Sequence, residues 1–195
     1  MPQRQKQMQM VATVNKYLAI CAFLVASPAF ATGLEIDIAG DANGTIVIDL
    51  FEDVAPKHVE QITALAAEGA YDGVVFHRVI EGFMAQTGDV EFGKAGGDTS
   101  GAGRGGSSRP DLPAEFSDLN FERGVVGMAR SQNPNSANSQ FFIMFDEGSF
   151  LNGQYTVVGK VTSGMDVVDQ IKLGKGANGS VLGAPDQMKA VRVTD

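Results

Sequence analysis

The segment FHRVIEGFMAQTGD, residues 76–89, decides how this chain is best interpreted. Its residues alternate as in half-buried strands, and Glu81-Gly82 between the two halves is a turn signal. The segment therefore predicts two neighbouring strands that bring four side chains close together: Arg78, Phe83, Met84 and Gln86. Taken alone, Arg78 has a simpler interpretation, as a solvated strand residue beside core aromatics.

Two further segments indicate a surface outside the core. In SQFFIM, residues 139–144, Phe141 and Phe142 are adjacent, so the two-residue period of a strand turns one ring away from the core. A large aromatic side chain on an outer face indicates a groove or a partner. The turn GSFLNGQY, residues 148–155, adds a third cluster of apolar and polar groups.

Short strands and turn signals account for most of the remaining chain. A helix is expected over residues 53–69, with Asp53 as its N-cap, and a short one over residues 165–172. Asn43-Gly44 is a two-residue hairpin signal. Because no βαβ alternation occurs, the pattern indicates an antiparallel barrel or sandwich. Since helices are available to plug the ends, we favour a closed eight-stranded antiparallel β-barrel capped by two α-helices. The strands are expected at residues 34–38, 45–50, 74–79, 83–87, 125–129, 141–145, 156–161 and 188–193.

The glycine-rich stretch at residues 93–109 is expected to be a long surface loop, because strand patterns resume beyond it. Gly101, Gly103 and Gly106 match a G-x-G-x-x-G string. A dinucleotide site needs a strand before this string and a helix after it, and the proline-containing residues 107–113 cannot form a helix. The string therefore does not indicate a nucleotide site.

Several common chemistries lack their residues. His58 and His77 are the only histidines and have no metal-ligand spacing, so neither a zinc site nor a cofactor is expected. His58 is expected to be exposed on its helix. No serine lies in a G-x-S-x-G elbow, so a serine hydrolase is unsupported. The scattered carboxylates could include an acid–base pair, but nothing in the sequence singles one out.

Length and charge limit the domain count and the partners. With 195 residues, of which 44% are hydrophobic, the chain is long enough for one domain with a proper core. The formal net charge of −8 argues against nucleic acid as a partner, because nucleic acid favours clustered lysine and arginine. We expect no nucleic acid, no membrane association of the mature chain, and a monomer.

Residues 1–31 predict a cleaved secretory signal peptide, which leaves residues 32–195 as the mature domain. The apolar run YLAICAFLV, residues 17–25, follows positive charge and precedes the cleavage signal AFA at residues 29–31. This run is about half the ~20 residues of a membrane-spanning helix, although an uncleaved anchor is the alternative. Cleavage would also remove Cys21, the single cysteine. We therefore expect a periplasmic protein.

Four ordered motifs together resemble the cyclophilin family of peptidyl-prolyl cis-trans isomerases. They are FHRVI-x-GFM-x-Q-x-GD, G-[VI]-[VL]-x-MA, NS-QFFI and LNGQYTVVGKV, and the likeness extends from about Leu34 to Val193. The resemblance implies an eight-stranded antiparallel barrel closed by two helices. It also implies that a substrate proline lies in a hydrophobic pocket on the outer face of the barrel.

By motif position, the resemblance implies a role for each site residue. Arg78 would be the catalytic arginine, and Gln86, also catalytic, and Gln140 would bond the substrate backbone or hold Arg78 in place. Ala129 and Arg130 would border the groove that binds residues before the proline, and the loop at residues 93–109 would rim a neighbouring pocket. The proline pocket itself would be lined by Phe83, Met84, Phe142 and Leu151, and the substrate would also meet Phe150 and Tyr155.

Three of these residues depart from the family pattern. Members that bind cyclosporin tightly have tryptophan at the position of Phe150, so sensitivity to that drug is in doubt. Many members have histidine at the position of Tyr155, whose hydroxyl can still reach a carbonyl oxygen. Many have asparagine at the position of Arg130, and this long cation should favour acidic or neutral residues upstream of the proline.

The reaction implied by the resemblance needs no bond cleavage. An X-Pro bond must be twisted until its nitrogen lone pair is no longer shared with the carbonyl, and the guanidinium of Arg78 could donate a hydrogen bond to that nitrogen. The expected function is therefore peptidyl-prolyl isomerisation during the folding of exported proteins. The alternative is a non-catalytic module that binds proline-containing segments as a chaperone.

Overall fold

The structure, a computed structural model, describes residues 32–195. The expected signal peptide at residues 1–31, with Cys21, lies outside the described residues. Within the described part, no helix has the length and apolar character needed to cross a membrane. The same residues contain no cluster of three or more histidine, cysteine or acidic side chains that could hold a metal ion.

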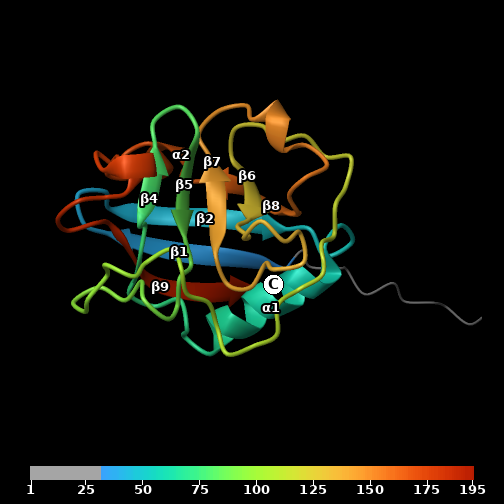
Figure 1. Cartoon of the computed structure of the whole chain (residues 1–195), viewed down its shortest axis with the longest axis horizontal. Helices are drawn as coiled ribbons and strands as arrows, with labels where there is room; N and C mark the ends of the chain where they lie inside the picture. Colours follow the sequence, from blue (N-terminus) through green and yellow to red (C-terminus); the bar gives the residue numbers. More distant parts are fainter. Residues whose placement is uncertain (1–31) are drawn as a thin grey trace, which may run out of the picture.

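One antiparallel sheet with a helix packed against it forms the described molecule. The strands are β1 (Gly33–Ala39), β2 (Gly44–Leu50), β3 (Val74–Val75), β4 (Arg78–Ile80), β5 (Met84–Thr87), β6 (Val125–Met128), β7 (Phe141–Met144), β8 (Val157–Ser163) and β9 (Gln187–Thr194). The helices are α1 (Pro56–Ala67) and α2 (Met165–Val168), with 3-10 turns η1 (Ser149–Leu151) and η2 (Ala177–Gly179). In Figure 1, β4, β5 and β7 stand upright, whereas β1, β2 and β9 run across them.

The sheet is curled rather than closed, so the expectation of a closed eight-stranded barrel is wrong. Its nine strands follow the order β3-β9-β1-β2-β8-β6-β7-β5-β4, and the two end strands do not pair with each other. The ninth strand arises because the stretch expected as one strand at residues 74–79 is divided. At Phe76-His77 the chain passes from β3, at one end of the sheet, to β4, at the other.

Loop segments bond the backbone groups along the free edges of β3 and β4, the two end strands, so these strands do not form a ladder with each other. The Val75 amide donates to the Gly93 carbonyl at 2.8 Å, which ties the start of the glycine-rich loop along β3. The Gly174 amide donates to the Val79 carbonyl at 2.9 Å, which ties the segment before η2 along β4. Because exposed strand edges can pair with other chains, this cover serves the purpose that barrel closure would have served.

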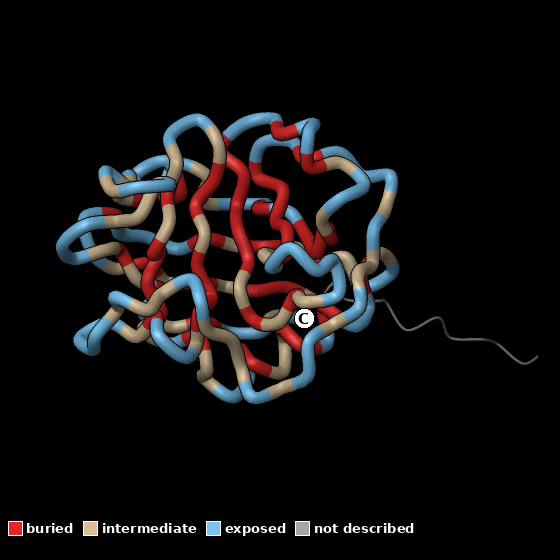
Figure 2. Tube along the Cα trace, viewed as in Figure 1, coloured by how far each residue is buried: buried red, intermediate tan, exposed pale blue. Residues whose placement is uncertain are grey.

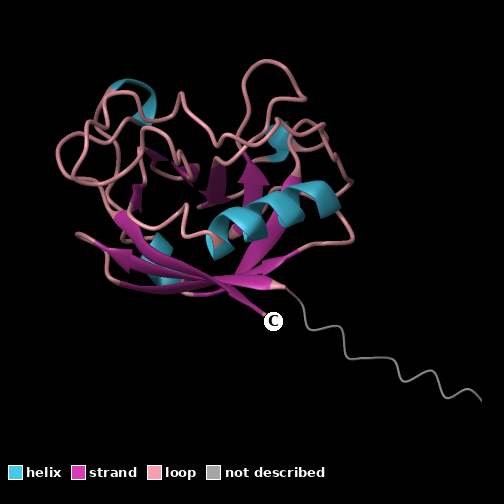
Figure 3. Cartoon of the chain, turned by 90° about the horizontal axis from the view of Figure 1, so that it is seen from below, coloured by secondary structure: helices cyan, strands magenta, loops and turns pink. Residues whose placement is uncertain are grey.

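Helix α1 begins at Pro56, three residues later than expected. The residue before a proline avoids the helical region, and Ala55 has φ −137° and ψ 63°. Asp53 therefore cannot be the N-cap. Pro56 occupies the first turn, where its missing N–H costs nothing. The helix packs against β9, on the inner side of the curl, as Figure 3 shows.

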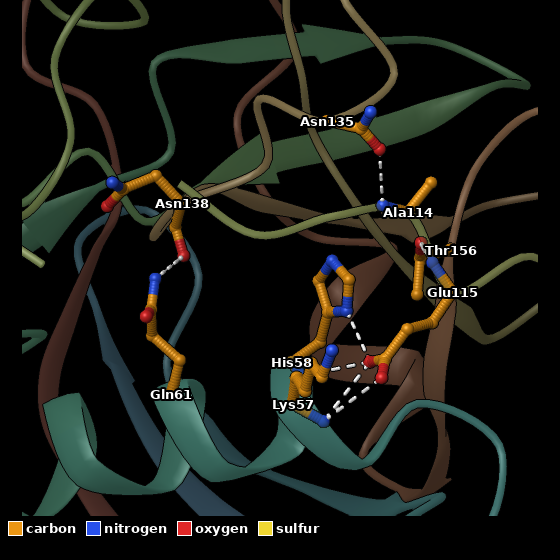
Figure 4. A network of polar contacts seen from close by, with 8 residues as sticks. All are labelled: Lys57, His58, Gln61, Ala114, Glu115, Asn135, Asn138 and Thr156. Atoms are coloured by element: carbon orange, nitrogen blue, oxygen red, sulfur yellow. Dashed lines mark hydrogen bonds and ion pairs between the residues drawn. The ribbon is translucent and has the colours of Figure 1, made fainter. Parts of the chain in front are cut away.

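A distant carboxylate caps α1 instead. Oε2 of Glu115 accepts from the backbone amides of Lys57 at 3.1 Å and His58 at 3.2 Å, and lies 2.7 Å from Nδ1 of His58 (Figure 4). The expectation that His58 is exposed is wrong, because this side chain is fully buried. A negative charge at a helix N-terminus also interacts favourably with the helix dipole.

Two other local expectations needed adjustment. Helix α2 ends at Val168 rather than near Lys172. The amides of Gln170 and Ile171 donate to carbonyls three residues back, and the Lys172 amide donates to the Asp186 side chain at 2.7 Å. The β1–β2 hairpin loop spans residues 40–43, so it is longer than the two residues that Asn43-Gly44 suggested.

The buried side chains form two separate clusters, and the buried stretches follow the strands in Figure 2. The larger cluster lies inside the curl and includes Phe141, Ile143 and Val79. The smaller cluster lies on the other face of the β6–β7–β5 region and includes Phe142, Met84 and Leu151. The adjacent rings Phe141 and Phe142 thus point to opposite faces, as the two-residue period predicts.

Candidate active site

The smaller cluster forms the floor of a recess of about 410 Å³ on the outer face of the sheet. We call this the outer recess. Its volume is within the usual range of small-ligand sites. The wall combines apolar side chains with two guanidinium groups and two amides. The lining residues are Arg78, Phe83, Met84, Gln86, Ala129, Arg130, Phe142, Phe150, Leu151, Gln154 and Tyr155.

Strand register places the central residues in one row. Arg78 on β4 faces Gln86 on β5, Gln86 faces Phe142 on β7, and Phe142 faces Gly127 on β6. Residues directly opposite each other on antiparallel strands point to the same face. The short strands and the tight turn at Gly82, which has φ 66°, therefore fix the cation, the amide and the ring side by side.

The apolar floor is well packed. The Phe142 ring stacks on Phe121 with centroids 5.7 Å apart and meets Tyr155 edge-on at 6.0 Å. Gly127 makes this stack possible, because a Cβ there would lie 2.5 Å from Phe121 and 2.6 Å from Phe142. At the outer edge Phe150 is 64% exposed and leans on Phe83. An exposed aromatic at the rim of an apolar recess is well placed to contact a bound group.

The Arg78 guanidinium is held from two directions. Its Nε donates to the Asn178 carbonyl at 2.9 Å, and its Nη1 donates to Oε1 of Gln86 at 3.1 Å. Nη1 also contacts the Met84 sulfur at 3.7 Å. Among residues 32–195, its Nη2 has no hydrogen-bond partner. Partial burial lowers the pKa of Arg78, but an arginine remains a cation at neutral pH.

A chain of amides leads from Arg78 to the glycine-rich loop. Gln86 Nε2 donates to Gln140 Oε1 at 2.9 Å, and Gln140 Nε2 donates to the Gly105 carbonyl at 2.8 Å. The Gly105 carbonyl can only accept, and the guanidinium can only donate. Both glutamine amides therefore have a single satisfactory orientation, which directs the Gln86 oxygen toward Arg78.

A buried carboxylate holds the loop in place. Asp89, which is fully buried, accepts from the amides of Glu91 and Phe92 through one oxygen, and from those of Gly103 and Gly105 through the other. Four backbone donors compensate a buried charge that would otherwise be costly. The loop can therefore present the Gly105 carbonyl at a fixed position.

A second hollow adjoins the first, and we call it the side recess. It has a volume of about 360 Å³ and shares Gln86, Ala129 and Arg130 with the outer recess. The glycine-rich loop forms its rim through Gly103, Arg104 and Gly105. The remaining lining residues are Ser131, Ser136, Asn138, Ser139 and Gln140.

Comparison with known proteins identifies the family. The family model "Cyclophilin type peptidyl-prolyl cis-trans isomerase/CLD" matches residues 34–193. This chain belongs to the cyclophilins. A protein of Brucella suis named "Probable peptidyl-prolyl cis-trans isomerase" is 65% identical over 148 residues, which cover 75% of this chain and 76% of that protein. The names of the family and of this relative indicate peptidyl-prolyl cis-trans isomerase activity.

Solved cyclophilin structures show the same fold. A crystal structure of a cyclophilin type peptidyl-prolyl cis-trans isomerase from Cryptosporidium parvum has a TM-score of 0.72 and 26% identity, covering 85% of this chain and 99% of that one. A second crystal structure of that protein, in the presence of the dipeptide Ala-Pro, has a TM-score of 0.70 and 27% identity, covering 84% and 99%. The resemblance stated from the four motifs is therefore confirmed.

The structure of this cyclophilin brings the expected site residues together. All of them line the outer recess except Gln140, which lines the side recess and bonds Gln86. Sequence reasoning missed Asn178, whose carbonyl supports Arg78, and Asp89, which anchors the loop. The dipeptide Asn178-Gly179 was a signal for a tight turn. Nothing local connected that turn to Arg78, which lies 100 residues away.

Proposed function

We propose that the outer recess isomerises X-Pro bonds with Arg78 as its catalytic side chain, in polypeptides that fold after export. The observation that carries the first part is the juxtaposition of a fixed guanidinium with an apolar recess on the same sheet face. Cyclophilins bind proline-containing peptides, and this recess can hold a proline ring against Phe142, Met84 and Leu151.

The barrier to the reaction is electronic. Rotation about a peptide bond costs ~18–20 kcal/mol because the nitrogen lone pair is shared with the carbonyl. For X-Pro bonds the two isomers differ by only ~1 kcal/mol, yet they exchange over tens to hundreds of seconds. A catalyst therefore has to stabilise the twisted amide, in which the nitrogen becomes basic.

Arg78 supplies a donor that acts mainly in the transition state. Nη2 has no partner among the described residues, so it can donate to the prolyl nitrogen once that nitrogen regains its lone pair. In the planar ground state the same nitrogen is a poor acceptor. Such a bond, weak before the twist and strong during it, is what accelerates a reaction. The apolar floor strengthens it by excluding water.

The required stabilisation is modest. Shortening a process of ~100 s to ~10 ms needs a factor of ~10⁴, or roughly 5.4 kcal/mol. A charge-assisted hydrogen bond supplies about 1.5–3 kcal/mol, and orientation of the bound ring supplies the remainder. Neither a covalent intermediate nor a proton transfer enters this mechanism.

The test is a proline-peptide isomerisation assay on residues 32–195. Arg78→Ala should lower kcat/KM about 10- to 150-fold, because it removes the transition-state donor. Arg192→Ala, which changes an arginine on β9, serves as the matched control and should leave the rate unchanged. Equal rates for Arg78→Ala and the unchanged protein would refute the role of Arg78. Peptide binding without catalysis in the unchanged protein would instead favour the chaperone alternative.

The export part of the proposal has its own support and its own test. It rests on the apolar run and the AFA signal within residues 1–31 and on the absence of cysteine after Cys21. N-terminal sequencing of the protein from its native cells should find Thr32 first, in the periplasmic fraction. An intact N-terminus in the cytosolic fraction would contradict it.

A further inference from the structure

The arginines of this chain fall into two groups of different character. Among residues 32–195, three arginines form ion pairs with carboxylates: Arg109 with Glu68, Arg123 with Asp169, and Arg192 with Glu35 and Asp37. The other three in this part of the chain, Arg78, Arg104 and Arg130, have no such partner. All three of the latter line the outer recess or the side recess.

The recesses contrast with the charge of the whole chain. The formal net charge is −8, yet no acidic residue lines either recess. Three carboxylates bond residues close by. Asp89 is buried and bonded by four amides, Asp111 accepts from Asn138 at 3.0 Å, and Glu91 accepts from the Gly106 amide at 3.4 Å. Because surface charges are screened over ~8 Å at physiological salt, the more distant carboxylates that give the chain its negative net charge contribute little inside the recesses.

Arg130 is fixed at the boundary between the two recesses. Its Nε and Nη2 donate to the Gln154 carbonyl at 3.2 and 2.8 Å, and its Nη1 donates to the Ser131 carbonyl at 2.9 Å. The guanidinium also lies 4.3 Å from the centroid of the Tyr155 ring. These contacts immobilise the group without neutralising it. Two of its five N–H donors have no partner among the described residues.

Arg104 stands on the opposite rim of the side recess. It is exposed, and its Nη2 donates to the Ser100 carbonyl at 3.0 Å within the glycine-rich loop. The Asp89 anchor fixes the flanking residues Gly103 and Gly105, so the position of Arg104 along the rim is fixed too. The side recess is thus lined by one arginine on the loop side and by another just after β6.

We propose that the side recess selects an acidic side chain near the isomerised proline, at the second or third residue before it. The proposal rests on the proposed function, because it takes the proline to lie in the outer recess. The two hollows share Arg130, so an extended chain with about 3.3 Å per residue reaches the side recess within a few residues. The preferred clients are therefore chains with aspartate or glutamate shortly before a proline.

The experiment compares three peptides that differ at one position, with glutamate, glutamine or lysine two residues before the proline. A second set places the same residues three before it. In one of the sets, kcat/KM should be about five- to twentyfold higher for glutamate than for glutamine, and lowest for lysine. Each exposed or half-buried charge pair contributes a factor of about two to five. Raising the salt concentration should reduce the ratio of kcat/KM for the glutamate peptide to that for the glutamine peptide.

Variants of the two arginines test which of them causes the preference for glutamate. Arg104→Gln and Arg130→Gln should each lower the glutamate-to-glutamine ratio about two- to fivefold, and the double variant should bring it near one. Arg104→Glu should turn the preference toward lysine. Arg192→Gln, which changes a paired arginine on β9, is the matched control and should leave the ratio unchanged. Because the readout is a ratio, a general loss of activity in an Arg130 variant does not affect it.

The two possible failures are distinguishable. Equal kcat/KM for glutamate and glutamine in both sets, with normal turnover, would overturn this inference and leave the proposed function standing. A preference for glutamate that survives in the double variant would also overturn it. No turnover of any peptide would contradict the proposed function itself.

Discussion

At the scale of single residues, the Gln140 side chain controls the direction of a hydrogen-bond chain that ends at Arg78. Its Nε2 faces the Gly105 carbonyl, so its oxygen must face Gln86. The Gln86 oxygen is one of the two acceptors that hold the Arg78 guanidinium. Its orientation follows from the Gly105 carbonyl, which lies outside the outer recess. We regard Gln140 as a positioning residue for Arg78.

Replacing Gln140 by leucine tests whether these hydrogen bonds position Arg78. Gln140→Leu should lower kcat about two- to tenfold with little change in KM, because a neutral hydrogen bond contributes about 0.5–1.5 kcal/mol and Arg78 acts mainly in the transition state. Steady-state kinetics of proline-peptide isomerisation measure both constants. Gln170→Leu, which removes an exposed amide that bonds the Asp166 carbonyl and lines neither recess, should change neither constant. An effect confined to KM would show that Gln140 only binds substrate.

A second prediction at the scale of single residues concerns Asn178. It has φ 53°, a left-handed conformation that asparagine tolerates and β-branched residues do not, and its carbonyl accepts from Nε of Arg78. Asn178→Val should therefore destabilise the turn by about 1–3 kcal/mol and lower kcat/KM. Asn178→Gly keeps the conformation accessible and should remain close to the unchanged protein. Denaturant unfolding and the isomerisation assay together check both statements.

At the scale of elements, helix α1 depends on a residue that is remote in sequence. Its own N-cap position, Ala55, offers no side-chain acceptor, and Glu115 serves this purpose from a loop. That loop is itself fixed, since the Glu115 amide donates to the Thr156 hydroxyl at 3.0 Å and the Ala114 amide to Asn135 at 2.9 Å (Figure 4). The cap therefore joins the helix to the segment before β6 and to the start of β8.

Removing the cap should destabilise the whole domain. Glu115→Ala leaves two helix amides and the buried His58 ring without their acceptor, and should lower the free energy of unfolding by about 2–4 kcal/mol. Urea unfolding followed by circular dichroism measures the change. Glu122→Ala, which breaks an exposed pair with Lys160, should cost less than about 1 kcal/mol. Equal stability of the two variants would contradict the capping role.

The strands illustrate how far local patterns reach. The period of two in residues 141–144 was enough to predict that Phe141 and Phe142 lie on opposite faces of the sheet, because the pleat alone sets that alternation. The same period could not predict that the expected strand at residues 74–79 divides into β3 and β4. The sequence around Phe76-His77 is compatible with a continuous strand, and the chain bends there because the two ends of the curled sheet approach each other.

At the scale of the whole molecule, His77 lies at the junction between those two ends. Its side chain is buried, and neither ring nitrogen has a hydrogen-bond partner among residues 32–195. A Cβ on Gly103 would lie 3.1 Å from the His77 ring, so the glycine-rich loop packs directly on it. Burial lowers the pKa of His77 because the charged ring would be desolvated.

This burial predicts acid sensitivity with a definite sign. Below the unfolded pKa of about 6.5, the unfolded chain binds a proton at His77 that the folded protein resists, so stability falls as the pH falls. Between pH 6.5 and 5.5 the contribution is at most about 1 kcal/mol. Unfolding free energies measured across this range should decline less steeply for His77→Leu than for the unchanged protein. If the unfolding free energy fell equally steeply with pH in the two proteins, His77 would not be the source of the acid sensitivity.

The sequence by itself determined the family, the helices and strands in outline, and the identity of the residues around the outer recess. Strand and helix periods depend on the local backbone, and the resemblance of the four ordered motifs supplied the family and the recess residues. Only the tertiary structure decided that the sheet stays open, that Glu115 caps α1, that Asn178 holds Arg78, and that the unpaired arginines gather at the recesses. These are contacts between distant segments, and they depend on how the sheet curls, which no local pattern encodes.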